Sequence, residues 1–477
     1  MNIMKWREGR EPAEPRGIVL RDTVRYTAIV DGWERAWEVY IPKAYTGEKK
    51  VPAIFCVHGA GGFSTAKTAW PLIAERENIL LVYPEAKEPW LWNIWGVKTK
   101  DGAPDDVAFL DYLVDWVQKK YMVDKSRIYM QGNSMGDNMV STYAYEHGNR
   151  LAAIAPTSGP TLPSVQCNEK GEFVISPKYP LPVVRLHGDR DSKCGFPSTY
   201  GISKYKFEKD VTLEEQWKLR AMMDQMQKDQ WNQVNQANHI PELYFTDYYN
   251  LEIYRGEYAE LYYYSVVEGE HSPDLDFYEI IWRHCFSGWR RAGGISVRTG
   301  AEEPPAQDLA ASALAEGTDW IYTGGKIKKI NGEQQPECIN HIWYVPVELL
   351  PVLVQGLKIE GDMTEQHELT LLYKQVKVEI AEGECCILVN GRVVSIPLIR
   401  RRGEKMMIPF AELAEKSLGL CTDSRDGVLY VTDHSVKLTK DGVRIILELL
   451  NLRQRLRGDI SFERELRDRI IKDTEEV

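Results

Sequence analysis

Between residues 25 and 291, short apolar runs rich in β-branched and aromatic residues alternate with stretches of helical periodicity, and each run ends in turn-forming or polar residues. This alternation predicts a mostly parallel sheet with helices on both faces, which is an α/β fold. The apolar runs are 51–57, 79–83, 127–131, 151–155, 182–186 and 261–267.

A change of composition divides the 477 residues, a length that suggests two or three domains. Residues 292–318 are rich in Ala, Gly, Glu and Pro and contain no aromatic residue, which is typical of a linker. We therefore predict an α/β domain over 1–291, a linker over 292–318, a smaller α+β domain over 319–440 and a helical tail over 441–477.

The smaller domain contains an internal repeat, because 343–360 and 406–423 share residues at one constant spacing. The shared positions are Pro346 and Pro409, Leu350 and Leu413, and Gly356 and Gly419. Each copy follows an Asn-Gly turn and predicts a short helix and then a strand. Two such units stacked together would bury apolar surface that neither buries alone.

Charge and hydropathy exclude several classes of partner. Lys and Arg number 59 against 70 Asp and Glu, a net charge of −11, which provides no positive field for nucleic acid or an anionic membrane. A small neutral substrate is the easier partner. The apolar runs are far shorter than the roughly 20 residues of a membrane-spanning helix. The N-terminus lacks the apolar segment of a secretory signal, so we expect an intracellular protein or a mature form.

The motif with most chemical content is Gly132-Asn133-Ser134-Met135-Gly136, between a strand-like run and the helical stretch 138–146. In a G-x-S-x-G motif of this context, the serine lies on a strained strand-to-helix turn and the glycines allow close backbone approach. The alternative is a serine in an ordinary Gly-rich turn. We interpret Ser134 as a candidate nucleophile.

A serine hydroxyl is a weak nucleophile at neutral pH and requires a histidine that is oriented by an acid. The run 182–186 is followed by His187-Gly188-Asp189-Arg190-Asp191, and the run 261–267 is followed by Glu268-Gly269-Glu270-His271. Both segments follow strands, where loops at the carboxyl edge of the sheet are expected. We favour Asp191 over Asp189 as the acid because it lies further into the loop, and His271 as the base.

Acyl transfer also requires hydrogen-bond donors for the developing oxyanion. The backbone N–H of Met135 is one candidate, and that of Ala60, with Gly61 as the close alternative, is the second. Trp92 and Trp95 are candidate substrate-binding residues that would stack on a ring above Ser134, although core packing is the alternative. The long insertion 192–260 is either a lid or an ordinary crossover with extended loops.

Motifs for cofactors are missing from the sequence. It contains no G-x-x-x-x-G-K-[ST], no spaced dinucleotide glycines, no H-E-x-x-H and no paired Cys/His set. The eight cysteines form no C-x-x-C pair, and we expect reduced thiols. We therefore expect no cofactor and no catalytic metal.

Several of these segments together resemble the polyhydroxybutyrate-depolymerase and feruloyl-esterase branch of α/β-hydrolases. The segments are 58–62, 105–110, 132–136, 151–156 and 187–191. The resemblance covers about residues 20–290 and implies a carboxylic-ester hydrolase that acts on feruloyl, acetyl or related esters of polysaccharides, or on polyesters. It assigns the triad to Ser134, Asp191 and His271. The sequence departs from the branch at Asp137-Asn138, where glycine or small residues are common.

The repeat in 319–440 resembles the copper-amine-oxidase N-terminal-like (stalk) domain, which is appended to exported bacterial enzymes. The resemblance implies no catalytic residue and no copper. It implies a module that positions the enzyme, contacts the cell envelope or mediates self-association. It also implies export, and the compartment therefore stays open between the cytoplasm and the envelope.

Two other functions remain open from the sequence. The first is a serine peptidase on the same scaffold, although neither an acidic site for a substrate amino group nor an added propeller is evident. The second is a non-catalytic binding or attachment protein with a relic hydrolase domain, against which the complete Ser, Asp, His order argues.

Overall fold

The structure is a computed structural model. It describes residues 23–61, 68–87, 91–94, 103–159, 176–191, 225, 227–271, 275–300, 308, 310–361 and 367–455.

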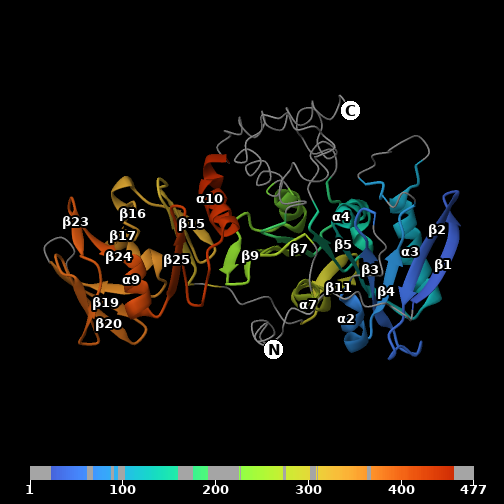
Figure 1. Ribbon diagram of the computed structural model, residues 1–477, viewed down its shortest axis with the longest axis horizontal. Helices are drawn as coiled ribbons and strands as arrows, with labels where there is room; N and C mark the ends of the chain where they lie inside the picture. The colour runs from blue at the N-terminus through green and yellow to red at the C-terminus, as the bar shows by residue number, and fades with distance from the viewer. Residues whose placement is uncertain are drawn as a thin grey trace, which may run out of the picture.

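A ten-stranded sheet forms the N-terminal part of the fold (Figure 1). Its six central strands are parallel, and an antiparallel pair extends the sheet at each edge. This strand order is that of an α/β-hydrolase fold, so the predicted fold class is confirmed. In order across the sheet, the strands are β1 (Thr23–Val30), β2 (Trp33–Tyr40), β4 (Leu80–Pro84), β3 (Val51–Val57), β5 (Val123–Asn133), β6 (Ala153–Thr157), β7 (Val183–Gly188), β10 (Leu261–Val266), β9 (Tyr249–Tyr254) and β8 (Glu242–Phe245).

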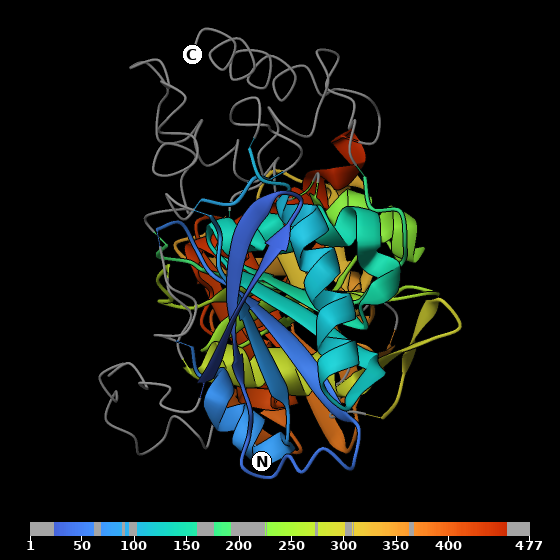
Figure 2. The ribbon, with the colours of Figure 1, turned by 90° about the vertical axis from the view of Figure 1, so that its right-hand side faces the viewer.

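Helices cover both faces of this sheet. Alternate residues of its buried strands point to opposite faces, so each face has apolar side chains that a helix must cover. On β3, Phe55 packs into the core beneath α3 and α4, whereas Ile54 packs into the core beneath α2 and α7. Figure 2 shows α3 and α4 on one side of the sheet and α2 on the other. These helices are α2 (Trp70–Glu77), α3 (Asp106–Lys120), α4 (Met135–His147) and α7 (Leu275–His284), with the short turns η1 (Gly148–Arg150) and η2 (Phe286–Gly288).

Two acidic residues lie at the start of helix α3, and they have different roles. The Asp105 carboxylate accepts a hydrogen bond from the Ala108 N–H and is the N-cap. Asp106 is instead buried against Arg35, 2.5 Å away, and also accepts the Asn93 N–H. The first acidic residue therefore caps the helix, and the second ties it to β2.

The C-terminal region consists of three further antiparallel sheets, preceded by the hairpin of β11 (Trp289–Ala292) and β12 (Ile295–Arg298). The first sheet contains β15 (Lys326–Lys329), β14 (Trp320–Thr323), β13 (Ser312–Ala315), β26 (Val428–Thr432) and β25 (Cys421–Arg425). The second contains β16 (Glu337–Ile339), β17 (Ile342–Pro346), β24 (Lys405–Pro409) and β23 (Arg400–Arg402). The third contains β18 (Lys358–Glu360), β19 (Glu368–Tyr373), β20 (Val376–Ala381), β21 (Cys386–Val389) and β22 (Arg392–Ser395). The helices and turns are η3 (Gly332–Gln334), η4 (Val347–Leu349), α8 (Leu350–Leu353), α9 (Phe410–Leu413), the π-turn η5 (Ala414–Leu418) and α10 (Lys440–Arg455).

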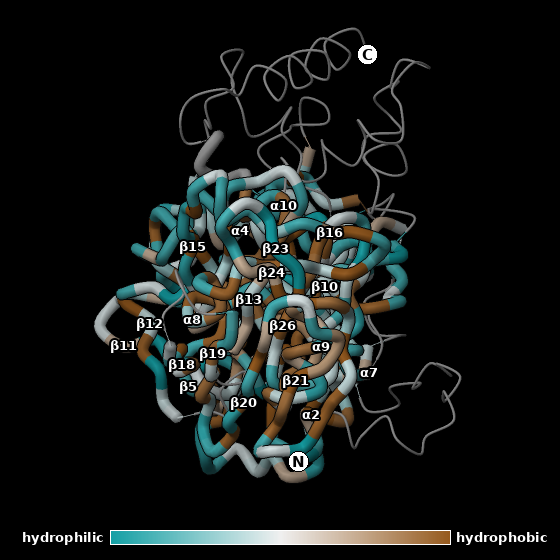
Figure 3. Tube along the Cα trace, turned by 90° about the vertical axis from the view of Figure 1, so that its left-hand side faces the viewer, coloured by the Kyte–Doolittle hydropathy of each residue, from teal (hydrophilic) through white to brown (hydrophobic). Residues whose placement is uncertain are grey.

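The two copies of the sequence repeat contact each other through equivalent strands. β17 and β24 pair antiparallel, with Tyr344 opposite Pro409 and Pro346 opposite Met407. In each copy a short helix follows, α8 in the first and α9 in the second. The apolar residues of both copies form one shared core, and Figure 3 shows hydrophobic stretches along β21, β26 and α9 with hydrophilic loops around them.

The predicted linker differs from the structure. Residues 292–318 include strands β12 and β13, and Ala311 and Ala313 beside or within β13 are fully buried. Small side chains that are typical of a linker are here packed between β26 and neighbouring elements. Composition alone could not separate these two roles, because small residues suit both a mobile chain and a tightly packed strand.

Helix α10 lies between the ten-stranded sheet and the C-terminal sheets (Figure 1). Its apolar face packs in one core with Phe245 of β8 and Tyr430 of β26, whose rings stack at 4.9 Å. The predicted tail thus begins with a helix, Lys440–Arg455, that packs on the core through residues up to Leu450. None of the described helices is long and apolar enough to cross a membrane.

Candidate active site

The serine of the G-x-S-x-G motif lies on a strand-to-helix turn, as its sequence context predicts. Ser134 follows β5 and precedes α4, with φ 58° and ψ −121°, a backbone conformation that is strained for a residue with a side chain. Two backbone hydrogen bonds hold the turn: the Ser134 N–H donates to the Thr157 carbonyl at 2.9 Å, and the Asp137 N–H donates to the Ser134 carbonyl at 3.0 Å. Ser134 is 6% exposed.

The turn packs directly against the loop that follows β3. A Cβ built on Gly136 would lie 2.2 Å from the Val57 carbonyl oxygen, so only glycine allows this approach. On the other side, Gly59 lies against Ser134, since a Cβ on Gly59 would be 3.2 Å from the serine Cβ. The loop containing Ala60 is therefore next to the serine, where the sequence predicts oxyanion donors. Met135, the other predicted donor, is the first residue of α4 and is partly buried.

The predicted acid and base contact each other. The His271 Nδ1–H donates to Asp191, with Nδ1 2.9 Å from Oδ2 and 3.1 Å from Oδ1. The Asp191 side chain is 1% exposed and that of His271 is 13% exposed. This pairing leaves Nε2 of the imidazole as the unprotonated nitrogen in the neutral ring, which is the tautomer a general base needs. Between the two candidate acids, the structure pairs Asp191 with the histidine.

Asp189, the alternative acid, lies in a different environment. Burial, reinforced by the negative charge of Asp441, raises the pKa of Asp189 to about 6. Its N–H donates to the Val266 carbonyl at 3.0 Å, and this bond joins the loop that carries Asp189 and Asp191, the acid loop, to the end of β10. Asp189 therefore belongs to the packing between the two loops.

The acid and base loops meet through two glycines. The Arg190 N–H donates to the Gly269 carbonyl at 2.9 Å, and a Cβ on Gly188 would lie 2.1 Å from the Gly269 oxygen and 2.7 Å from the Glu270 oxygen. Both neighbours are backbone atoms, so a side chain here must push the loops apart. The close contact thus fixes the separation of Asp191 and His271.

We expect Gly188→Ala to lower the free energy of unfolding by about 1–3 kcal/mol, the usual cost of overpacking a tight interior. Urea denaturation would measure it. Gly332→Ala is the matched control, because a Cβ there meets nothing within 4 Å. Equal effects of the two substitutions would contradict the close contact.

A buried histidine and tryptophan hold the loop after β3. His58 Nε2 accepts the Ala86 N–H at 3.0 Å, and its Nδ1–H donates to the Gly59 carbonyl at 2.6 Å. Burial lowers the pKa of His58, which favours this neutral form. The Trp92 indole N–H donates to the His58 carbonyl at 2.8 Å. His58 thus orients the loop.

Trp92 does not occupy the position of a substrate-binding wall in this structure. Its side chain is 1% exposed and lies beside the His58 ring at 4.8 Å, beneath the loop. The prediction of a stacking surface is therefore replaced by a supporting role for this residue. Trp95, its predicted companion, lies outside the described residues, as do residues 192–224 and 226 of the insertion that the sequence predicts as either a lid or an ordinary crossover.

A buried ion pair that we did not predict from the sequence lies next to the serine turn, at Asp137 in the first turn of α4. Asp137 accepts the Gly159 N–H at 2.9 Å and pairs with Arg185 of β7 at 3.2 Å. Arg185 also donates to the Gly159 carbonyl at 2.5 Å. Burial raises the pKa of Asp137 to about 6, although Arg185 acts against this shift. An arginine within the apolar run 182–186 was the available signal, since a buried charge requires a partner.

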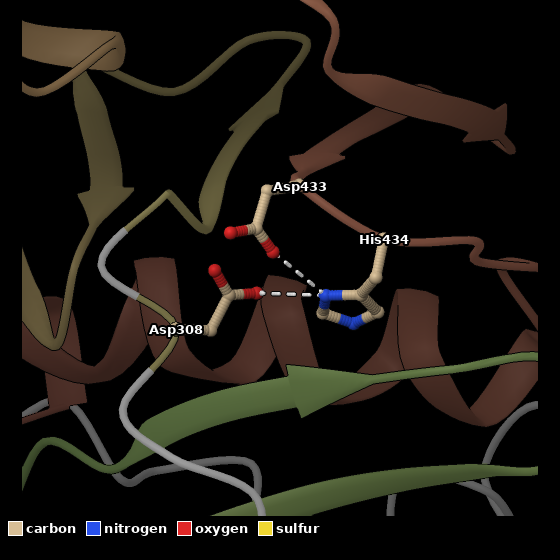
Figure 4. A group of neighbouring side chains, drawn as sticks. All are labelled: Asp308, Asp433 and His434. Atoms are coloured by element: carbon tan, nitrogen blue, oxygen red, sulfur yellow. Dashed lines mark hydrogen bonds and ion pairs between the residues drawn. The ribbon is translucent and has the colours of Figure 1, made fainter.

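A second group of ionisable side chains lies away from this edge, where β8 meets the C-terminal sheets (Figure 4). Asp308 and Asp433 both face Nδ1 of His434, at 3.8 and 3.1 Å. The opposite ring nitrogen, Nε2, donates to the Phe245 carbonyl at 2.7 Å. Such a group could hold a cation. Asp308 also accepts hydrogen bonds from Thr432 and Ala310, so the group forms a hydrogen-bonded contact between the two regions.

The family comparison concerns the N-terminal part of the chain. Residues 29–255 match the family described as putative esterase. A bifunctional acetylxylan esterase/xylanase of Neocallimastix patriciarum is 26% identical over 157 residues, which are 32% of this chain and 21% of that protein. Feruloyl esterase B of Piromyces equi is 24% identical over 183 residues, which are 37% of this chain and 32% of that protein.

Among solved structures, the acetyl xylan esterase from Aspergillus awamori is similar at 16% identity with a TM-score of 0.39. The match covers 55% of this chain and 99% of that one. The chain spans less than a third of the length of the two curated relatives described above. In sequence, the part of this chain that carries the serine turn and the acid loop is thus similar to proteins described as putative esterases.

Proposed function

We propose that this protein is a serine carboxylic-ester hydrolase in which Ser134, His271 and Asp191 form the catalytic triad. The hydrogen bond between His271 and Asp191 is the observation that carries the proposal most directly, because it links two loops 80 residues apart at the edge where the serine turn also lies. The strained turn at Ser134 and the adjacent loop with Ala60 supply the remaining parts that acyl transfer needs.

In the proposed reaction, His271 Nε2 removes the Ser134 proton as the serine oxygen attacks the ester carbonyl carbon. The oxyanion accepts hydrogen bonds from the N–H groups of Met135 and Ala60, and the protonated His271 gives its proton to the departing alcohol. Water then attacks the acyl-enzyme with His271 again as base, which releases the acid and restores the serine. Asp191 stabilises the imidazolium throughout.

For the substrate we propose acyl esters of carbohydrates, feruloyl or acetyl. The similar proteins are named acetylxylan esterase and feruloyl esterase, and the net charge of −11 favours a neutral substrate over an anionic one. A panel of methyl ferulate, acetylated xylan and p-nitrophenyl acetate, with aminoacyl amides beside them, tests this proposal. Turnover of amides alone would point to a peptidase. No turnover, together with no labelling of Ser134 by a fluorophosphonate, would point to a binding protein.

We expect Asp191→Asn to lower kcat for p-nitrophenyl acetate by about 10⁴-fold with little change in KM, because the amide no longer holds the imidazole in the required tautomer. Asp189→Asn is the matched control, since Asp189 lies two residues earlier in the same loop and is packed against β10. Steady-state kinetics of both variants would decide between the two acids. A larger loss for Asp189→Asn would reverse the assignment.

A further inference from the structure

The N-terminal turn of α10 inserts a carboxylate between two strands of the ten-stranded sheet. The Asp441 side chain is 1% exposed, and its Oδ2 lies 2.9 Å from His187 Nε2 and 2.8 Å from Ser265 Oγ. His187 belongs to β7 and Ser265 to β10, and the two residues are direct partners in the parallel pairing of these strands. One carboxylate oxygen thus bridges two neighbouring strands.

These are the strands that lead to the acid and the base. His187 is followed at once by Gly188 and the loop to Asp191, and Ser265 is followed by the loop to His271. Beyond the bridge, the two loops contact each other through the close packing of Gly188 and a backbone hydrogen bond from Arg190 to Gly269. An exposed ion pair between Arg190 and Glu268 also joins them. The carboxylate therefore lies where the relative position of the loops is set.

The helix is anchored so that Asp441 cannot easily withdraw. Thr439 Oγ1 accepts both the Gly442 N–H at 3.1 Å and the Asn250 side-chain amide of β9 at 2.8 Å, which caps the helix and ties it to the sheet. Gly442 allows this close approach, because a Cβ there would lie 3.2 Å from Asn250 Oδ1. Arg444 approaches Asp441 Oδ1 at 3.4 Å from the next turn.

The remainder of α10 packs on the C-terminal sheets. Ile446 and Leu450 are buried in the core that also contains Tyr322 and Tyr430 of these sheets. Asp441 follows the strands of the C-terminal sheets in the sequence. Helix α10 therefore connects those sheets to the sheet that carries the candidate triad.

We propose that Asp441 is a positioning residue for the acid and base loops, so that the C-terminal region, through α10, is required for the geometry of the Asp191–His271 pair. This inference rests on the proposed function for its kinetic readout. Its geometric readout does not depend on catalysis.

The test compares Asp441→Asn with Glu448→Gln in the full-length protein. Both remove one carboxylate charge from α10, but Glu448 pairs with Arg444 on the same helix and does not bridge the strands. For Asp441→Asn we expect kcat/KM for p-nitrophenyl acetate to fall by about 10–100-fold, the scale of loss when a catalytic group is displaced by a fraction of an ångström to an ångström. The fall should be in kcat with KM within threefold, after rates are normalised to the fluorophosphonate-titrated active sites. Glu448→Gln should stay within threefold of the parent.

The geometric readout is the downfield proton NMR signal of the His271 Nδ1–H that donates to Asp191. We expect Asp441→Asn to shift or broaden this signal and Glu448→Gln to leave it unchanged. If Asp441→Asn does not fold, Ser265→Ala, which removes one donor to the same carboxylate, should show the same effects at smaller size.

The outcomes are distinct. A parent protein with no esterase activity would contradict the proposed function, and the NMR signal would still test the bridge. An active parent whose Asp441→Asn and Ser265→Ala variants keep normalised kcat within threefold and an unshifted signal would overturn this inference. A loss that disappears on normalisation would assign Asp441 to stability alone and overturn it equally.

Discussion

Ser134→Ala is expected to abolish ester hydrolysis, with a fall in kcat of at least about 10⁴-fold, because the proposed acyl-enzyme forms on the hydroxyl that this change removes. Fluorophosphonate labelling should disappear with it. The measurement is initial-rate kinetics on p-nitrophenyl acetate together with intact-protein mass spectrometry after labelling.

A second substitution at this position separates chemistry from folding. Ser134 has φ 58°, which costs a residue with a side chain about 1–3 kcal/mol and costs glycine almost nothing. Ser134→Gly should therefore be as inactive as Ser134→Ala but more stable than it in urea denaturation. Ser424→Ala, at an exposed serine of β25, is the control and should change neither quantity. Residual turnover above a thousandth of the parent rate in Ser134→Gly would show that another residue is the nucleophile.

Asp137→Ala is expected to lower the free energy of unfolding by about 3–5 kcal/mol, because it leaves the buried Arg185 guanidinium without its charged partner. Urea denaturation of Asp137→Ala, Arg185→Met and the double variant measures this effect. The double variant should be more stable than the sum of the single losses predicts, since it removes both buried charges. Glu379→Ala, in an exposed ion pair with Lys377, should cost less than about 1 kcal/mol. Additive losses at Asp137 and Arg185 would contradict their coupling.

The same pair gives stability a pH dependence whose sign follows from the raised pKa. Burial raises the pKa of Asp137 in the folded state to about 6, from an ordinary value of 3.8. Between these values the folded state binds a proton that the unfolded state has released, so this group makes stability fall as pH rises from about 4 to 6. Asp137→Asn should remove that part of the slope. A parent and variant with parallel stability curves over this window would contradict the raised pKa.

Much of the α/β-hydrolase domain could be predicted because its strands are buried on both faces and therefore appear as continuous apolar runs. The serine turn and the order of acid and base followed from where such runs end. The choice of Asp191 over Asp189 rested on its distance from the strand end, and the hydrogen bond to His271 agrees with that choice. The triad itself stays a prediction for the experiments described above.

Other features depend on contacts between residues far apart in the chain, and no local sequence pattern predicts these contacts. The carboxylate of Asp137 has its partners in Arg185 and Gly159, which are 48 and 22 residues away in the sequence. Trp92 is an aromatic residue of the kind that forms stacking surfaces, but its side chain is buried in the core. Asp441 lies in a segment that the sequence predicts as a helical tail. Its partners His187 and Ser265 are 254 and 176 residues away in the sequence.

The late position of α10 in the sequence has a consequence for biosynthesis. His271 leaves the ribosome some 170 residues before Asp441, which at about 5–20 residues per second is a delay of roughly 10–30 s. Over that interval the nascent chain contains the three residues of the proposed triad but not the helix that bridges the strands before two of them. Full hydrolytic competence is therefore expected only once synthesis of the C-terminal region is complete, and a ribosome-stalled chain ending near residue 400 should hold a folded but poorly active sheet.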